Sequence, residues 1–137
     1  MALSLNPYIS LRGTARDALE FYRSVLGGTV EITEFSAFPG QGIPDDDQSL
    51  VMHGQLTTDD GFVLMVSDTP STMEYAEPAG FSVSISGEDA AKLEGFWNGL
   101  ADGGTIVMPY EAPPWGGRFG MLKDRFGIDW MVALNAA

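Results

Sequence analysis

The chain has 137 residues, of which 7 are lysine or arginine and 19 are aspartate or glutamate, so its formal charge is -12 at pH 7. So few basic residues, scattered along the sequence, form no patch for a nucleic acid or an anionic membrane, and we expect neither partner. With one histidine and no cysteine, a single chain cannot hold a metal between two imidazoles, ligate zinc or an iron–sulfur cluster through thiolates, or form a disulfide.

The length predicts a single domain, residues 1–137, and an apolar fraction of 45% is sufficient for a hydrophobic core. Residues 1–7 contain neither the basic segment nor the apolar run of a secretory signal. No apolar stretch approaches the roughly 18 residues of a membrane span. We therefore expect a cytoplasmic protein.

The first half of the chain predicts a strand, a helix and three further strands. Residues 8–13 alternate as a strand does, and a Gly-Gly-Thr turn at residues 27–29 leads into a second strand. Residues 51–56 and 62–66 flank a turn and form a predicted hairpin. Between the first two strands, apolar residues recur at helical spacing, at Ala15, Ala18, Leu19, Tyr22 and Leu26.

The second half repeats this order. Residues 82–87 form the alternating strand, Gly103-Gly104-Thr105 forms the turn, and residues 119–122 and 128–132 form the hairpin. The apolar positions of the second predicted helix are Ala90, Leu93, Phe96, Trp97 and Leu100.

This internal repeat predicts the fold. When the two halves are aligned on the glycines of their hairpins, Met65 matches Met131. We expect an α+β protein built from two tandem βαβββ modules, residues 5–68 and 80–135, joined by a polar connector, residues 69–79. The modules should form a concave, mixed but mostly antiparallel sheet with a helix on one face of each module. A cleft between duplicated modules is a favoured place for a small ligand.

Local signals predict the helix starts and one long loop. Thr14 is placed to cap the first helix, with Asp17 as its capping-box partner, while Glu88 and Asp89 place negative charge at the start of the second helix. Residues 38–47 form a long insertion between two strands. Its three successive aspartates lack the spacing of an EF-hand, which favours a solvated, mobile loop over a calcium site.

Two βαβββ modules are typical of the vicinal oxygen chelate superfamily, which includes glyoxalase I, extradiol dioxygenases and bleomycin-resistance proteins. Over nearly the whole chain, the local segments resemble the PhnB-like branch of that superfamily. The resemblance lies in Asn6-Pro7-Tyr8, Ala18-Leu19-Glu20-Phe21-Tyr22, Gly27-Gly28, Val51-Met52-His53, Leu64-Met65-Val66-Ser67-Asp68, Gly103-Gly104-Thr105, Met108-Pro109, Trp115-Gly116, Phe119-Gly120-Met121, Asp124-Arg125-Phe126-Gly127 and Trp130-Met131-Val132.

The resemblance implies where a metal would be bound. Members that use a divalent ion hold it by one His or Glu from the first and last strand of each module, which corresponds here to Asn6 or Pro7, Met65, Phe81 and Met131. None of these is a histidine or a carboxylate, and thioethers are poor ligands for such ions. We therefore expect no metal at the inherited site and no cofactor, although the sequence leaves a divalent metal elsewhere open.

The leading hypothesis is a metal-independent protein that binds a small, partly apolar molecule in the cleft between its modules. The candidate ligand-binding residues are Met65, Phe81, Trp115, Arg118 and Met131. Trp115 could be a lid that stacks on a ligand, with Arg118 holding an anionic group, or it could fill the cleft mouth or pack on a partner. Core packing is the alternative role for each methionine. The resemblance also implies a homodimer.

His53 is the only imidazole, and we consider it as a catalytic residue. In the cleft it could act as a general base or as a hydrogen-bond donor to a ligand; the alternative is a strand residue satisfied by its neighbours. Strand register decides between them. A two-residue turn would set His53 opposite Val66, whereas a longer loop would set it beside Ser67, on the face of Met65.

Two other functions are compatible with the sequence. One is a metal-dependent lyase, isomerase or dioxygenase with a displaced metal site, built from His53 and carboxylates such as Glu111 or Asp68. The other is sequestration of a cationic drug of the bleomycin type, which an acidic protein would attract. Similar proteins have been described as demethylubiquinone methyltransferases, yet the sequence has no glycine-rich strand-to-helix loop for S-adenosylmethionine. Whether the protein is an enzyme stays open at this stage.

Overall fold

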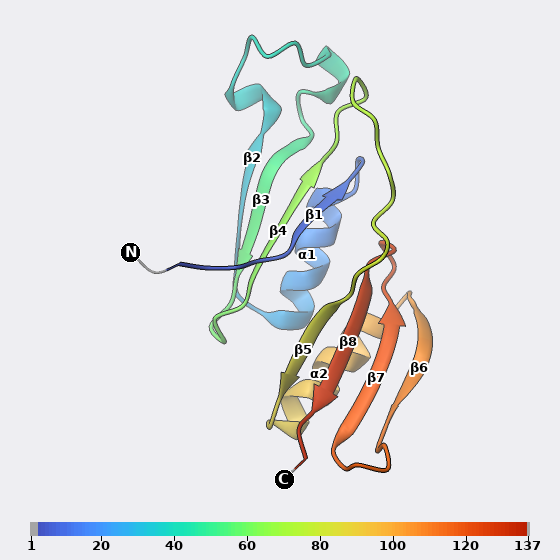
Figure 1. The fold of residues 1–137 in the computed structure, drawn as a ribbon. Helices are drawn as coiled ribbons and strands as arrows, with labels where there is room; N and C mark the ends of the chain where they lie inside the picture. The colour runs from blue at the N-terminus through green and yellow to red at the C-terminus, as the bar shows by residue number, and fades with distance from the viewer. Residues whose placement is uncertain (1–2, 137) are drawn as a thin grey trace. The chain divides into compact units, whose positions relative to one another are not determined.

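The computed structural model describes residues 3–136, and the chain divides into two compact units between Glu77 and Pro78. Each unit contains one four-stranded sheet and one longer helix (Figure 1). The units together confirm the predicted α+β fold of two βαβββ modules.

The first unit holds the strands of the first sheet. Its elements are β1 (Tyr8–Leu11), α1 (Ala15–Leu26), β2 (Thr29–Glu34), β3 (Val51–Thr57) and β4 (Val63–Asp68). The strand order is β1-β4-β3-β2, in which β1 runs parallel to β4 and the other neighbours are antiparallel. Two short 3-10 helices, Phe35–Ala37 and Asp45–Asp47, lie between β2 and β3.

The second unit repeats this topology. Its elements are β5 (Val83–Gly87), α2 (Ala90–Ala101), β6 (Thr105–Glu111), β7 (Arg118–Lys123) and β8 (Asp129–Leu134). The order β5-β8-β7-β6, with β5 parallel to β8, is the same as in the first sheet. The edge strand β6 pairs with β7 through two register shifts.

Each helix buries its apolar face against its own sheet. All five predicted positions of α1 are buried, and so are Leu93, Phe96, Trp97 and Leu100 of α2. Ala90, the first residue of α2, is exposed, so its prediction as a core position was wrong. On the first sheet the helix covers Ile9, Leu11, Leu56, Leu64 and Val66, all at most 4% exposed.

Two glycines let the helices approach the sheets. A Cβ atom on Gly54 would lie 2.2 Å from Cδ1 of Leu19 in α1, and one on Gly120 would lie 2.8 Å from the indole ring of Trp97 in α2. Neither distance is possible for non-bonded carbon atoms, so a side chain at either position would displace Leu19 or Trp97. The two glycines occupy equivalent places in β3 and β7, as the alignment of the halves predicted.

Strand pairing corrects that alignment at the first strand of each module. Val66 lies opposite Ile9 in the first sheet, and Val132 lies opposite Ile85 in the second. Tyr8 therefore corresponds to Ser84, two residues beyond the position that the sequence repeat gave it. The error arose because the sequence alignment matched Gly13 with Gly87. Gly87 is the last residue of β5, whereas Gly13 lies beyond the end of β1.

The start of α1 is stabilised by a residue distant in sequence. The Thr14 side chain makes no capping hydrogen bond, so the predicted capping box was wrong. Instead, Asp68 at the end of β4 accepts hydrogen bonds from the backbone N–H groups of Gly13 at 2.7 Å, Ala15 at 3.1 Å and Val51 at 3.0 Å. Asp68 is 4% exposed. A buried carboxylate thus satisfies amides at the helix start that have no intrahelical partner.

The start of α2 follows the sequence more closely. The Asp89 side chain accepts a hydrogen bond from the Lys92 backbone N–H at 3.1 Å, as expected of a residue that caps a helix. This confirms the local signal at the second helix. The two modules therefore cap equivalent helices with residues from different elements.

The insertion between β2 and β3 is anchored by one of its aspartates. Asp45 and Asp46 are exposed, as predicted, but Asp47 is buried and accepts hydrogen bonds from the Ser71 hydroxyl at 2.6 Å and backbone N–H at 2.9 Å. The Ser71 side chain, then its backbone N–H, lower the pKa of Asp47 below its ordinary value of 3.8. At Asp47 the prediction of a fully solvated loop was therefore wrong.

The two hairpin turns share a backbone frame but differ in side chains. The Thr58 N–H donates to the Phe62 carbonyl at 3.0 Å, and the Asp124 N–H donates to the Ile128 carbonyl at 2.8 Å. Thr58 and Asp124 thus occupy equivalent positions, and both are buried. The Thr58 hydroxyl accepts one bond, from the Phe62 N–H at 3.1 Å.

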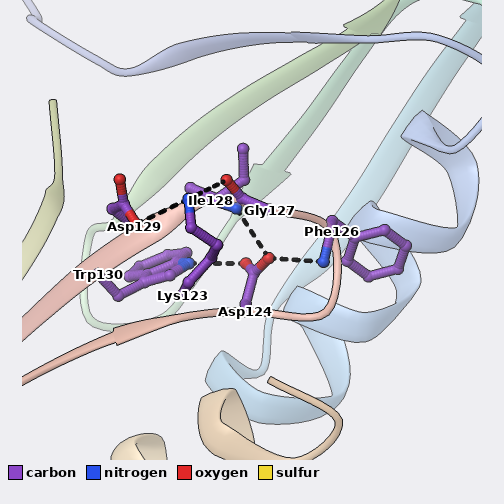
Figure 2. Close-up of polar contacts among 7 residues, drawn as sticks. All are labelled: Lys123, Asp124, Phe126, Gly127, Ile128, Asp129 and Trp130. Carbon is purple, nitrogen blue, oxygen red and sulfur yellow. Dashed lines mark hydrogen bonds and ion pairs between the residues drawn. The ribbon is translucent and has the colours of Figure 1, made fainter. Parts of the chain in front are cut away.

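Asp124 organises its turn more extensively (Figure 2). One carboxylate oxygen accepts the backbone N–H groups of Phe126 at 2.8 Å and Ile128 at 3.1 Å. The other oxygen accepts the indole N–H of Trp130 at 2.8 Å. In the same turn, Lys123 forms an ion pair with Asp129 at 3.1 Å. The Asp124 carboxylate is therefore occupied by structural partners.

No helix among residues 3–136 is both long and apolar enough to cross a membrane.

Candidate functional site

In each unit the helix covers one face of the sheet and leaves the other face free of helix, as Figure 1 shows for α1 and α2. We call these the helix-free faces. Because side chains alternate along a strand, the residues on these faces follow from the register. They include three of the six candidate site residues: His53, Met65 and Met131.

A row of side chains crosses the helix-free face of the first sheet. Tyr8 pairs with Met65, Met65 with Gln55, and Gln55 with Glu31, so the row runs from β1 to β2. Met65 is partly buried, whereas Tyr8 is 52% exposed. This face therefore offers one thioether among polar groups.

His53 lies on the same face, because the loop between β3 and β4 is longer than a two-residue turn. Gly54 pairs with Val66, so His53 neighbours Ser67 on the face that carries Met65. Of the two registers compatible with the sequence, the structure contains the one with the longer loop. The imidazole is partly buried and points away from α1.

Tyr8 contacts His53 across β4. The phenol oxygen lies 3.3 Å from Nδ1 of the imidazole, within hydrogen-bond distance, and the two ring centroids are 5.7 Å apart. The sequence contained no signal for this contact, because the two residues are 45 positions apart. Tyr8 is the residue of this site that sequence reasoning missed.

A polar hollow of about 480 Å³ lies on the first sheet beside this row. It is lined by Thr29, Glu31, Gln55, Thr57, Thr58 and Asp59. Hydroxyl groups, one amide and two carboxylates make it suitable for a polar or cationic group. Gln55 belongs to both the hollow and the row, so the two features adjoin.

The helix-free face of the second sheet is richer in methionine. Met131 pairs with Ser84 on one side and with Met121 on the other, and Met121 pairs with Met108. Three thioethers therefore occupy adjacent strands. Met108 is 46% exposed, and the other two are partly buried. Methionine is flexible and polarizable, so such a face can adapt to ligands of irregular shape.

The remaining candidates of the second unit lie outside this row. Trp115 is in the loop between β6 and β7 and is 76% exposed, and Phe81 precedes β5 and is 44% exposed. Arg118, the first residue of β7, donates to the Tyr110 carbonyl at 3.3 Å and places its guanidinium 5.8 Å from the centre of the Tyr110 ring. Arg118 is thus held against β6.

Tyr110 is a further unusual residue of the second unit. Its ring stacks on Trp97 of α2 at a centroid distance of 5.4 Å. Its hydroxyl is buried and has no hydrogen-bond partner among residues 3–136. Burial raises the pKa of this phenol, and the nearby Arg118 charge opposes that rise. A buried phenol that stays neutral fits a packing role.

The positions that would carry a divalent metal do not offer suitable ligands. Met65 and Met131 supply thioethers, and Asn6, Pro7 and Phe81 supply an amide or no donor at all. Strand pairing moves the second-module equivalent of Asn6 or Pro7 two residues along the chain, to a serine or a valine. Within residues 3–136, no three or more His, Cys, Asp or Glu side chains are grouped so that they could hold an ion. Divalent ions prefer imidazole and carboxylate ligands, so the donor set does not fit.

Asp68, a carboxylate considered for a displaced metal site, is not available to His53. Its oxygens accept three backbone N–H groups on the helix-covered side of the first sheet, while His53 lies on the helix-free face. The two side chains therefore lie on opposite sides of the sheet. This excludes a shared metal between them in one chain.

Comparison with known proteins identifies the family. The family model described as 3-demethylubiquinone-9 3-methyltransferase matches residues 4–133. The crystal structure of protein PA1353 from Pseudomonas aeruginosa is 35% identical, with 99% of this chain and 100% of that chain covered and a TM-score of 0.87.

Two further structures show the same fold. A PhnB protein from Bacillus cereus is 21% identical, covers 97% of this chain and 100% of its own, and has a TM-score of 0.75. A glyoxylase/bleomycin resistance protein/dioxygenase domain from Frankia sp. EAN1pec is 14% identical over 98% of both chains, with a TM-score of 0.67. The chain therefore belongs to the family described as 3-demethylubiquinone-9 3-methyltransferase, and its fold is that of the PhnB protein and of the glyoxylase/bleomycin resistance protein/dioxygenase domain.

Proposed function

We propose that this protein binds a small, partly apolar molecule on the helix-free faces of its sheets and does so without a metal ion. The observation that carries the proposal is the chemistry at the inherited metal positions, where Met65 and Met131 stand in place of imidazole or carboxylate ligands. Both thioethers lie on helix-free faces. A site that has exchanged metal ligands for flexible apolar side chains favours binding through contact area.

A neutral apolar dye tests the binding surface. Nile red fluorescence should rise with the wild-type protein, and Met65→Gln should weaken dye binding about fivefold, since roughly 1 kcal/mol of apolar contact is lost. Met131→Gln should act similarly. Met73→Gln, in the exposed part of the connector, is the matched control. Equal binding by wild type and all three variants would contradict the proposal.

Calorimetric titration tests metal independence. We expect no stoichiometric, tight binding of Ni²⁺, Zn²⁺, Mn²⁺ or Fe²⁺ to the metal-free protein. Tight binding of any of these ions at one site per chain would overturn the metal-free part of the proposal. Loss of that binding in His53→Ala would then support the displaced metal site, with its lyase, isomerase or dioxygenase chemistry.

The name of the family implies methyl transfer, but the local structure does not support a nucleotide-like cofactor. Such cofactors are commonly held by free amides where a strand leads into a helix. At α1 these amides donate to Asp68, and at α2 the Asp89 side chain caps the first turn. We therefore derive no methyl-transfer step for this chain.

A second candidate function is sequestration of a cationic molecule of the bleomycin type. The polar hollow favours it, because Glu31 and Asp59 line this hollow in a chain with a net charge of -12. Titration with bleomycin should then give saturable binding that weakens in Glu31→Gln and at high salt. Glu77→Gln, in the connector, is the control for a general charge effect. Equal weakening in both variants would count against the hollow.

We also propose that the protein is a cytoplasmic homodimer, as its relatives' family implies. Sedimentation equilibrium of the purified chain tests the assembly, and fractionation of expressing cells tests the compartment. A monomer at all concentrations would contradict the first statement, and recovery outside the cytoplasm would contradict the second.

A further inference from the structure

The hydrogen bond between Tyr8 and His53 has a consequence for the ligand. It joins β1 to β3 over the intervening strand β4, so both side chains lie on the helix-free face near Met65. A phenol on a half-exposed strand does not need a protein partner, since water can satisfy it. The contact therefore affects the imidazole more than the phenol.

The contact determines which nitrogen of His53 carries the proton in the neutral ring. A neutral imidazole has one N–H donor and one bare nitrogen that accepts, and the bond at one nitrogen sets the role of the other. The phenol hydroxyl donates more readily than it accepts, because its oxygen lone pair is delocalised into the ring. We therefore expect Nδ1 to accept from Tyr8 and Nε2 to keep the proton.

The surroundings indicate what this Nε2–H group can bind. Glu31 lies on the same face, and the whole chain carries a charge of -12, so a carboxylate or phosphate ligand would be repelled. Met65 lies between β1 and β3 and offers apolar contact beside the donor. A ligand with an uncharged oxygen acceptor attached to an apolar group would avoid repulsion by Glu31 and would gain apolar contact with Met65.

We infer that Tyr8 is a positioning residue that fixes His53 as a hydrogen-bond donor through Nε2, and that this donor binds an uncharged carbonyl oxygen of a partly apolar ligand. The second half of this inference rests on the proposed small-molecule function. The first half concerns the free protein alone. The two can therefore fail separately.

The first experiment measures the tautomer without any ligand. Because His53 is the only histidine, ¹⁵N NMR of protein labelled at histidine reports this ring alone. In the neutral ring, we expect the proton almost wholly on Nε2 in the wild type and a measurable Nδ1–H population in Tyr8→Phe, which keeps the aromatic ring. Thr33→Val removes the hydroxyl of the cross-strand neighbour of His53 and should leave the tautomer unchanged. The same tautomer ratio in wild type and Tyr8→Phe would overturn the positioning role.

The second experiment uses a matched pair of probes, acetophenone and ethylbenzene, which share an apolar ring and differ in a carbonyl oxygen. We expect acetophenone to bind more tightly to the wild type and to shift the Nε2 resonance of His53. In Tyr8→Phe the ratio of acetophenone affinity to ethylbenzene affinity should fall at least threefold, since this ratio cancels any change in apolar contact that the two probes share.

The outcomes separate this inference from the proposed function. Binding of both probes with equal affinity, or with no shift at Nε2, would overturn carbonyl recognition but leave apolar binding intact. Absence of binding by either probe, together with absence of Nile red binding, would overturn the proposed function as well. In that case the tautomer measurement still decides the role of Tyr8.

Discussion

The two modules have the same strand order, yet they stabilise equivalent helix starts in different ways. In the first, Asp68 of the last strand binds three backbone amides, whereas the equivalent residue of the second module is Leu134. There the local residue Asp89 caps the helix. The comparison teaches that a repeated backbone requires its amides to be satisfied but does not require the same residue to do it.

The hairpin turns differ in a correlated way. Asp124 and Trp130 of the second module are hydrogen-bonded, and the residues at the equivalent positions of the first module are Thr58 and Leu64. A threonine satisfies its own turn, while an aspartate has a second oxygen that needs a donor. The large indole supplies that donor, so the two positions depend on each other.

The helix-free faces differ most in chemistry. The row on the first sheet combines a phenol, a thioether, an amide and a carboxylate, whereas the row on the second sheet holds three methionines. The first face can orient a polar group, and the second can accommodate apolar surface. Equivalent faces of one duplicated fold therefore suit different ligand chemistry.

The largest effect is expected when the distant cap of the first module is removed. Asp68→Ala should lower the free energy of unfolding by about 4 kcal/mol, because three backbone amides, two of them buried, lose their acceptor. Urea denaturation measures this loss. Asp17→Ala removes an exposed carboxylate from the first turn of the same helix and should cost under about 1 kcal/mol. Equal losses in the two variants would show that Asp68 acts through its charge and not as a cap.

A smaller effect is expected when the turn of the second module is converted to that of the first. Asp124→Thr should cost about 3 kcal/mol, because the indole N–H of Trp130 and one backbone amide lose their acceptor. Adding Trp130→Leu should then cost about 1–2 kcal/mol less than it does in the wild type. A double-mutant cycle in urea measures this coupling. Strictly additive losses would show that the two positions are independent.

The local cap of the second module should contribute less than the distant cap of the first. Asp89→Ala should lower the free energy of unfolding by about 1 kcal/mol, as is typical of an exposed helix cap. Asp89→Ser, which keeps an acceptor, should recover most of this loss. A loss as large as that of Asp68→Ala would contradict the difference drawn between the modules.

The smallest effect concerns pH and the anchored insertion, which the second module lacks. Since Ser71 lowers the pKa of Asp47 in the folded state, the stabilisation is complete above the ordinary pKa of 3.8 and is lost as pH falls through the lowered value. The stability difference between wild type and Ser71→Ala should therefore shrink below about pH 4. Acid titration of both proteins in urea measures it. As a control, Asp46 is an exposed neighbour of Asp47. The stability difference between wild type and Asp46→Asn should not shrink below about pH 4 in this way.

Much of the fold was predictable from the sequence, because the repeat has strong local signals. Apolar periodicity located both helices, and the turn glycines aligned the hairpins of the two halves. The place of Met65 and Met131 on their strands was likewise clear before the structure. The sequence allowed two faces for His53, and it did not indicate that Tyr8 contacts this residue.

Only the tertiary structure decided which residues far apart in the chain contact one another. The sequence determined the order of elements, the acidic charge and the absence of metal ligands at the inherited positions, since these depend on residue types and on spacing within one element. The cap by Asp68, the anchor at Asp47 and the bond between Tyr8 and His53 each join separate elements. Strand register sets such contacts, and a shift of one residue would move every side chain of a strand to the opposite face.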